Sequence, residues 1–213
     1  SAFFAKHRLE NRRARKFLLS ANQLIFALVV IGYSILAPDS GWVGAFAMAA
    51  YLQLFTIRSG RFSQELKRPY LYLVPEPPMK KLLWSLLETF PSAALEALVI
   101  FVPVALLLRL TPVELAACFA GRLSFTVVYT AADVAVRRLW GGGLSRMVGA
   151  LLFLALSFAM ILPGLAAAVA AAVGWDGSAA AAVLAMAAAN LPLSLLVLFL
   201  CRNMLQYAEL NNQ

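Results

Sequence analysis

The chain has 213 residues, of which 62% are hydrophobic and only 13% are charged, and its mean hydropathy is +0.82. Soluble domains are roughly half apolar, so this composition excludes the water-soluble classes and indicates a membrane protein. The net charge of +8 does not indicate nucleic-acid binding. Almost every Lys and Arg flanks an apolar run, where such charges anchor helices at the cytoplasmic side.

Residues 1–16 are basic and amphipathic. On a helix, Arg8, Arg12 and Arg15 share one arc, while Phe3 lies roughly opposite. This pattern predicts an N-terminal amphipathic elbow helix that lies on the cytoplasmic surface of the lipid bilayer. A soluble basic tail is the alternative.

Six apolar runs follow, each close to the roughly 20 residues that an α-helix needs to cross a hydrocarbon core of about 30 Å. We therefore predict an all-α integral membrane domain over residues 17–209 with six transmembrane helices. The expected spans are residues 17–37, 41–57, 82–108, 112–136, 147–173 and 179–201.

The charge distribution predicts the orientation of these spans. With the N-terminus inside, almost all of the 18 Lys and Arg residues fall in cytoplasmic segments, whereas Arg109 lies outside and Arg122 lies within a span. The reverse orientation would invert this distribution. The positive-inside rule therefore predicts that both termini are cytoplasmic.

The last third is rich in alanine from residue 166 to residue 189 and is interrupted by Pro163, Gly164 and Pro192. Small residues let transmembrane helices approach closely, which is one interpretation of this run. The alternative is that the fifth span ends near Pro163 and that residues 165–188 dip back as a re-entrant pair near the outer face.

The sequence offers no visible carrier for enzymatic chemistry. His7 is the sole histidine, so a cluster of zinc-binding histidines is excluded. Neither a GxxxxGK[ST] motif for ATP nor a GxSxG nucleophile motif occurs, and Cys118 and Cys201 predict no disulfide framework. We therefore expect a chain that is not an enzyme and that holds no metal or cofactor itself.

Four ionisable residues lie inside the spans, where a charge costs roughly several kcal/mol unless it is paired or hydrated. Glu88 and Glu96 lie along one side of the third span, and Arg122, Tyr129 and Asp133 form a stripe on the fourth. Both sets should face protein. Glu88 and Asp133 are near the inner ends, where we expect them to be hydrated at the interface.

Glu96 and Arg122 lie deeper. They stand equally far before and after Arg109, in the turn between the third and fourth spans. Both lie about 21 Å from the cytoplasmic ends, at roughly 1.5 Å per residue. Equal depth on adjacent antiparallel helices predicts a buried ion pair. The alternative is that Arg122 faces a translocation path and meets an anionic group of the substrate.

The large connection, residues 58–81, is cytoplasmic in this orientation. A short helix over residues 61–67 should end before Pro69, because helical geometry is disfavoured for a residue that precedes proline. Aromatic and aliphatic side chains follow, and a simple linker would not expose them to water. We therefore expect another molecule to dock on this loop, with folding back onto the membrane surface as the alternative.

Two stretches, SAFFAKHRLENRRARKF at the start and GRFSQELKRPYLYLVPEPPMKKL in this loop, resemble the permease subunits of the putative ABC exporter family of bacteria. The resemblance implies a multi-pass protein of the bacterial cytoplasmic membrane. Its loop would act as a coupling helix that docks on a separate ABC ATP-binding subunit, and that partner would hold the ATP and magnesium. The residues implied in docking are Arg61, Phe62, Glu65, Leu66, Arg68, Pro69 and Tyr70.

The resemblance also implies a function, that of a permease subunit which moves a substrate by conformational coupling to ATP hydrolysis. Members of the family are longer, so the chain looks like a C-terminal half that works with a second membrane half or a second copy. The rival hypothesis is an ATP-independent multi-pass protein, either a small secondary transporter or a membrane assembly scaffold. A secondary transporter should show two related halves, and no clear repeat links the first three spans to the last three.

Overall fold

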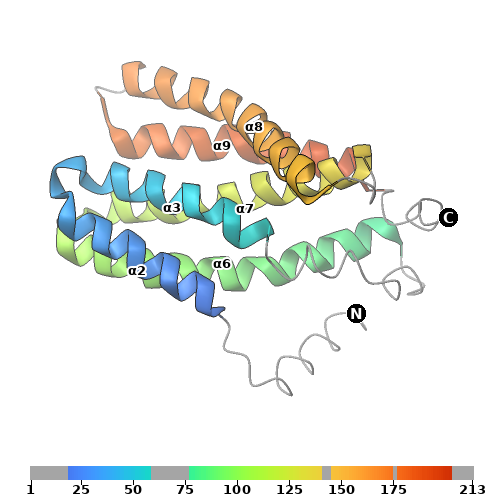
Figure 1. Cartoon of the computed structure of the whole chain (residues 1–213). Helices are drawn as coiled ribbons and strands as arrows, with labels where there is room; N and C mark the ends of the chain where they lie inside the picture. The colour runs from blue at the N-terminus through green and yellow to red at the C-terminus, as the bar shows by residue number, and fades with distance from the viewer. Residues whose placement is uncertain (1–18, 59–76, 141–144, 175–176, 203–213) are drawn as a thin grey trace.

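The computed structural model describes residues 19–58, 77–140, 145–174 and 177–202, and these ranges contain helices and turns but no strand. Successive helices run antiparallel and form one bundle (Figure 1), which agrees with the all-α prediction. The elements are α2 (Ala21–Leu36), the 3₁₀ turn η1 (Pro38–Ser40), α3 (Gly41–Arg58), α6 (Pro78–Leu108), α7 (Pro112–Trp140), α8 (Arg146–Gly174) and α9 (Ala179–Leu200).

The described residues test the prediction of six transmembrane helices. Among them, five helices, α3 and α6 to α9, are long and apolar enough to cross a membrane. In contrast, α2 has 16 residues and is only about 24 Å long. Its start is set by a capping box in which Ser20 and Gln23 bond to each other's backbone. The prediction is therefore supported for five spans, and the first expected span is a shorter apolar helix.

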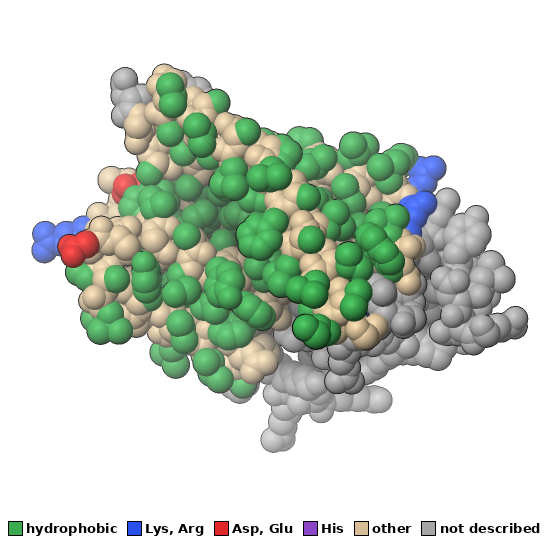
Figure 2. Space-filling model, turned by 45° about the horizontal axis from the view of Figure 1, so that its top comes forward, with side chains coloured by type: hydrophobic (Ala, Val, Ile, Leu, Met, Phe, Trp, Pro, Cys, Tyr) green, Lys and Arg blue, Asp and Glu red, His purple; other side chains and the backbone are tan. Residues whose placement is uncertain are grey.

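The central helix of the bundle is α7. In its apolar span 72% of the residues are buried, against 28–33% in the other four spans, and α3, α6, α8 and α9 all pack against it. In the outer helices, therefore, most side chains are only partly enclosed by the chain or are exposed on its surface. Figure 2 shows hydrophobic side chains over this surface, with Lys and Arg at its two ends.

A glycine in α7 explains how α3 and α9 can both pack closely against this helix. A Cβ atom at Gly121 would lie 2.6 Å from the ring of Phe46 in α3 and 3.0 Å from Cγ1 of Val183 in α9. The missing side chain therefore lets both helices pack closely against α7 at the same level.

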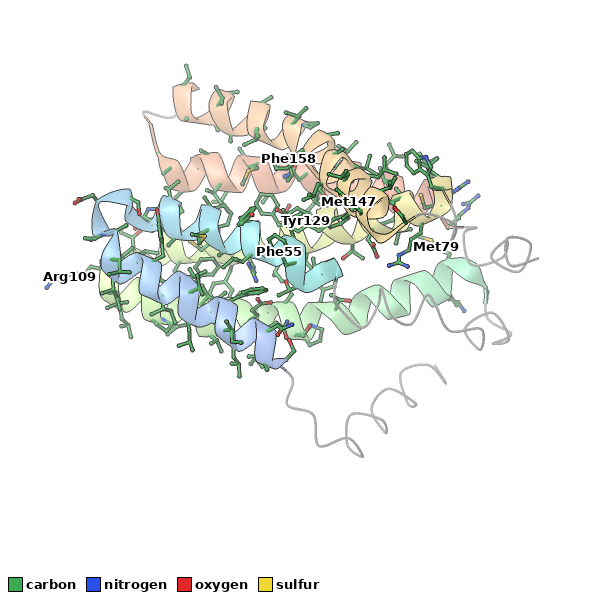
Figure 3. The ribbon with its side chains drawn as sticks, viewed as in Figure 1. Phe55, Met79, Arg109, Tyr129, Met147 and Phe158 are labelled. Atoms are coloured by element: carbon green, nitrogen blue, oxygen red, sulfur yellow. The ribbon has the colours of Figure 1, made fainter. Side chains whose placement is uncertain are left out.

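The turn between α6 and α7 sets the register of that hairpin. Arg109 ends α6 in the left-handed conformation, with φ of 54°, and Figure 3 shows its side chain pointing away from the bundle. The N–H and hydroxyl of Thr111 donate to Oε2 of Glu114, at 2.7 and 2.9 Å, and so start α7. Oε1 of Glu114 accepts from Nε1 of Trp42 at 2.8 Å, which ties α3 to the same end of the bundle.

The proline residues of the last third lie inside continuous helices. The α8 helix continues through Pro163, and α9 continues through Pro192. The alternative of a re-entrant pair over residues 165–188 is therefore wrong. Each proline removes one backbone donor, and a transmembrane helix tolerates this loss where neighbouring helices support it.

Candidate functional site

The two deep charged residues form an ion pair. Nη2 of Arg122 lies 2.6 Å from Oε1 of Glu96, and the two side chains are 1% and 4% exposed. The pair links α7 to α6, as their equal depth in the hairpin predicted. Pairing offsets much of the large cost of burying either charge alone.

Two further helices each contribute a contact to this pair. Nε2 of Gln23 in α2 donates to Oε2 of Glu96 at 3.2 Å, and Nη1 of Arg122 donates to the carbonyl of Ala49 in α3. Both charged groups are thus bonded to neutral groups as well as to each other. A buried ion pair needs such additional hydrogen bonds to be stable.

A second set of hydrogen bonds holds α3 against α7 beside the pair. Nε2 of Gln53 donates to the carbonyl of Arg122 at 3.2 Å and to Oγ1 of Thr126 at 2.7 Å. The hydroxyl of Tyr129, which Figure 3 shows inside the bundle, donates to the carbonyl of Ala50 at 3.1 Å. We call the following residues the Arg122 cluster: Gln23, Gln53, Glu96, Arg122, Thr126 and Tyr129.

The geometry of the Arg122 cluster is that of a lock between helices. Its members come from α2, α3, α6 and α7, and the guanidinium at its centre is 1% exposed. In this conformation Arg122 is enclosed by protein and does not face an open path. The cluster therefore fixes the relative register of the four helices.

Asp133 differs from the sequence-based expectation. It is buried together with Arg122 and Tyr129, so this stripe of α7 faces protein as predicted. Its carboxylate pairs with Nε of Arg137 at 3.0 Å. The expected hydration of Asp133 is therefore wrong, because the guanidinium one turn away reaches back along the helix and supplies the opposite charge. Glu88 belongs to α6, but its side chain lies outside the described part, and its hydration stays a prediction.

The predicted docking residues from Arg61 to Tyr70, like the amphipathic segment 1–16, lie outside the described residues. Both stay predictions. The helices on either side of the loop are described, since α3 ends at Arg58 and α6 begins at Pro78. The loop therefore connects two helices that both contribute to the Arg122 cluster.

Two further buried polar side chains, Ser157 on α8 and Asn190 on α9, were not included in the sequence-based predictions. Asn190 and Ser157 are each 1% exposed, and their side-chain polar atoms have no hydrogen-bond partner among the described residues. The carboxamide of Asn190 lies against Gly164, where a Cβ atom would be 2.5 Å from Cγ of Asn190. We call these three residues the Asn190 seam. A single Asn in a long apolar run is the signal that could have revealed it.

The described polar groups offer hydrogen bonding and charge pairing. In the part of the chain that the structure describes, no three His, Cys, Asp or Glu residues are grouped so that they could hold a metal ion. Cys118 and Cys201 are both buried as free thiols.

Comparison with known proteins identifies a family. A family model described as a putative ABC exporter covers residues 1–209, whereas no curated protein and no solved structure matches the chain. The matched range includes the basic N-terminal segment, the loop between α3 and α6 and all the described helices. Together with the five helices that can cross a membrane, this match shows that the chain belongs to the putative ABC exporter family and is a membrane transport protein.

Proposed function

We propose that the chain is a permease subunit, or half of one, in an ATP-driven exporter, and that it works with a second membrane half or a second copy. The observation that carries this proposal is the family match over residues 1–209. The chain moves its substrate by conformational coupling to a separate ATP-binding subunit, and ATP and magnesium bind to that partner.

The loop between α3 and α6 is the element that we propose for docking. The two helices that this loop joins both contact Arg122, α3 through the carbonyl of Ala49 and α6 through Glu96. A displacement of the loop by the ATP-binding subunit is therefore transmitted to α7. The α2 helix follows, because Gln23 bonds to Glu96.

The α8–α9 hairpin moves together with these helices in the proposal, because α7 packs more extensively against α9 than against any other helix. Ser124 of α7 also donates to the carbonyl of Ala187 at 3.2 Å. ATP binding would therefore rock this membrane half against the second half or second copy, so that a central path opens outward.

Co-expression tests the docking. The chain is produced together with candidate ATP-binding proteins from the same organism that carry a GxxxxGK[ST] motif, and one of them should co-purify with the chain and show ATPase activity. Glu65 stands among Arg61, Lys67 and Arg68 in the proposed docking helix. Replacing it, Glu65→Arg, should weaken co-purification at least about tenfold, because an attractive contact becomes a like-charge one.

The matched control for this test is Glu76→Arg, the same charge reversal in the same loop but outside residues 61–70. It should leave co-purification and ATPase activity at the wild-type level. If Glu65→Arg binds its partner normally and supports normal ATPase activity, docking through this helix is refuted. If no ATP-binding protein associates with the wild-type chain, the ATP-independent alternative is favoured.

Cysteine labelling in intact cells tests the orientation. Cysteines introduced at Ser40 and Ser178 should react with a membrane-impermeant reagent from outside, whereas those at Ser63 and Ser145 should react only after permeabilisation. The wild-type chain is the control, since its own two cysteines are buried. Labelling of Ser63→Cys from outside would reverse the orientation and remove the basis for cytoplasmic docking.

A further inference from the structure

Asn190 lies near the middle of the membrane. It stands about 17 Å from the start of α9, at 1.5 Å per residue, in a hydrocarbon core of about 30 Å. Its side chain is 1% exposed and lies against Gly164 of α8, so it is directed into the seam between the two helices. The polar atoms of this residue are therefore far from water at either surface.

The hydrogen-bonding capacity of the Asn190 seam is unused. A carboxamide can make about four hydrogen bonds and a hydroxyl about three, yet neither Asn190 nor Ser157 has a partner among the described residues. Ser157 lies on the same face of α8 as Gly164, two turns away. Because an unmade hydrogen bond in an apolar medium is costly, these groups provide a favourable place for a polar ligand.

Other small polar residues near the seam are already bonded. The hydroxyl of Ser194, one turn beyond Asn190, donates to the backbone carbonyl of Asn190 at 2.8 Å. The hydroxyl of Ser124 donates to the carbonyl of Ala187 at 3.2 Å. Burial in this part of the bundle therefore does not by itself leave a hydroxyl group unbonded. Oε1 of Gln53 and Nε of Arg122 also lack a hydrogen-bond partner among the described residues, but these two side chains are bonded through their other polar atoms. In Asn190 and Ser157 no side-chain polar atom is bonded.

The seam is electrically neutral. The α9 helix has no charged residue, and the only charged residue of α8 is Arg146 at its first position. The two buried charges of α7 are engaged elsewhere, Arg122 with Glu96 and Asp133 with a residue of its own helix. Arg138 interacts with Cys201 at the end of α9, which is about 17 Å along the helix from Asn190. An ion placed between α8 and α9 would lack a counter-charge, so the seam suits a neutral amide or hydroxyl group.

Two prolines lie close to the seam. Pro163 precedes Gly164, and Pro192 follows Asn190 by two residues. Neither proline has an N–H to bond the carbonyl four residues earlier, so both helices are weakened at the level where they meet. Helices interrupted near the midplane are a recurrent feature of substrate sites in membrane transporters.

We propose that Asn190 forms an intramembrane site that hydrogen-bonds a neutral amide or hydroxyl group of an otherwise apolar molecule, that Ser157, two turns away along α8, offers a second polar contact to the same molecule, and that the exported substrate is of this class. The assignment of the ligand as exported substrate rests on the proposed function. Binding itself needs only this chain, so it can be tested without an ATP-binding partner.

The test measures thermal unfolding of the purified full chain in phosphatidylcholine nanodiscs, whose lipids carry no amide or hydroxyl group. A thiol-reactive dye reports unfolding through the buried Cys118 and Cys201. The probe is N-(2-hydroxyethyl)dodecanamide, and dodecane is its apolar counterpart. The amide should raise the unfolding temperature by about 2–4 °C, as a ligand present at several times its Kd does for a chain of this size, and dodecane should not.

Three variants locate the site. Asn190→Leu should abolish the shift caused by the amide, and without the probe it should unfold at or above the wild-type temperature, because it removes polar atoms that have no partner. Ser157→Ala should reduce the shift and gives a second readout if Asn190→Leu does not fold. Ser194→Ala is the matched control and should keep the full shift, because the hydroxyl of Ser194 is bonded within its own helix.

The remaining outcomes overturn the proposal. An equal shift with dodecane means apolar partitioning, and a full shift in both Asn190→Leu and Ser157→Ala means binding elsewhere. No shift in the wild type, with Asn190→Leu unfolding at a lower temperature, means that Asn190 has a structural role supported by trapped water. Each of these results leaves co-purification with an ATP-binding subunit untouched, so the proposed function is judged separately.

Discussion

The two sides of α7 bury polar groups in opposite ways. On the side of α3 and α6, a full ion pair is enclosed and hydrogen-bonded by residues from four helices. On the side of α8 and α9, the polar residues are uncharged, yet two of them lack any hydrogen-bond partner among the described residues. The comparison teaches that charge alone does not mark a binding site in a membrane domain. A charged group that is paired with its counter-charge and bonded to several helices is a lock, whereas a neutral side chain with no partner on any polar atom is open to a ligand.

The physical reason lies in the size of the penalties. An unpaired charge at the membrane centre costs about 2.5–3.5 kcal/mol even on lenient insertion scales, so Arg122 must be surrounded by partners in the folded state. A neutral group without its hydrogen bond costs about 1–3 kcal/mol. The bundle can accept this smaller cost at Asn190 while it retains its fold.

The largest expected effect comes from removing the positive charge of the Arg122 cluster. Arg122→Gln leaves the carboxylate of Glu96 without its counter-charge, and we expect it to lower the free energy of unfolding by about 3–5 kcal/mol. Unfolding of the purified chain in mixed micelles, driven by increasing denaturing detergent, measures this change.

A double-mutant cycle distinguishes the pair from two independent sites. Glu96→Gln should also destabilise, and the double variant with Arg122→Gln should lose less than the sum of the single losses. Strict additivity would show that the two residues do not stabilise each other, and it would return Arg122 to the list of candidates for a substrate path.

More of the Arg122 cluster than of the Asn190 seam could be predicted from the sequence. The length of each apolar run predicts the helices, and the positions of Glu96 and Arg122 around Arg109 predict their common depth. Neither step requires knowledge of how distant helices meet. The roles of Gln23 and Gln53 could not be predicted in this way, since they depend on the placement of α2 and α3 against α6 and α7.

Sequence patterns predicted the structure of α8 and α9 less well, because the outcome there depends on how the two helices pack. Proline usually marks the end of a helix, so Pro163 allowed a re-entrant segment, yet packing against α9 and α7 keeps α8 continuous. Asn190 carries no charge and lies in an alanine-rich run, and its burial against Gly164 becomes visible only in the packed hairpin. A similar limit applies to Asp133, whose hydration was inferred from depth alone although Arg137 lies within reach.

The second prediction tests the close packing on the neutral side. Gly164→Ala places a methyl group where the carboxamide of Asn190 lies, and we expect a loss of about 1–3 kcal/mol in the free energy of unfolding. Gly32→Ala in α2 is the matched control. A Cβ atom at Gly32 meets nothing within 4 Å, so this change should be neutral or should stabilise the helix by up to about 1 kcal/mol. Equal losses in both variants would contradict the close contact.

The third prediction concerns the neutral partner of the ion pair. Gln23→Leu removes the hydrogen bond to Oε2 of Glu96, and since bonds to charged groups contribute about 1.5–3 kcal/mol, we expect a loss near the lower value. In the background of Glu96→Gln the same change should cost less, because the acceptor is then uncharged. An identical cost in both backgrounds would mean that Gln23 stabilises α2 only through its capping box with Ser20.

The smallest expected effect is the difference between two substitutions that each remove one hydroxyl group, one on each side of α7. Tyr129→Phe removes a hydroxyl that donates to the carbonyl of Ala50, and a hydrogen bond between membrane helices contributes about 0.6 kcal/mol on average. Ser157→Ala removes a hydroxyl that has no partner among the described residues, so it should leave the free energy of unfolding unchanged or slightly raised. Unfolding titrations repeated on both variants resolve this difference in sign. If Ser157→Ala destabilises the chain as much as Tyr129→Phe does, the hydroxyl of Ser157 is bonded in the folded protein, and the contrast between a closed and an open side of α7 fails at that residue.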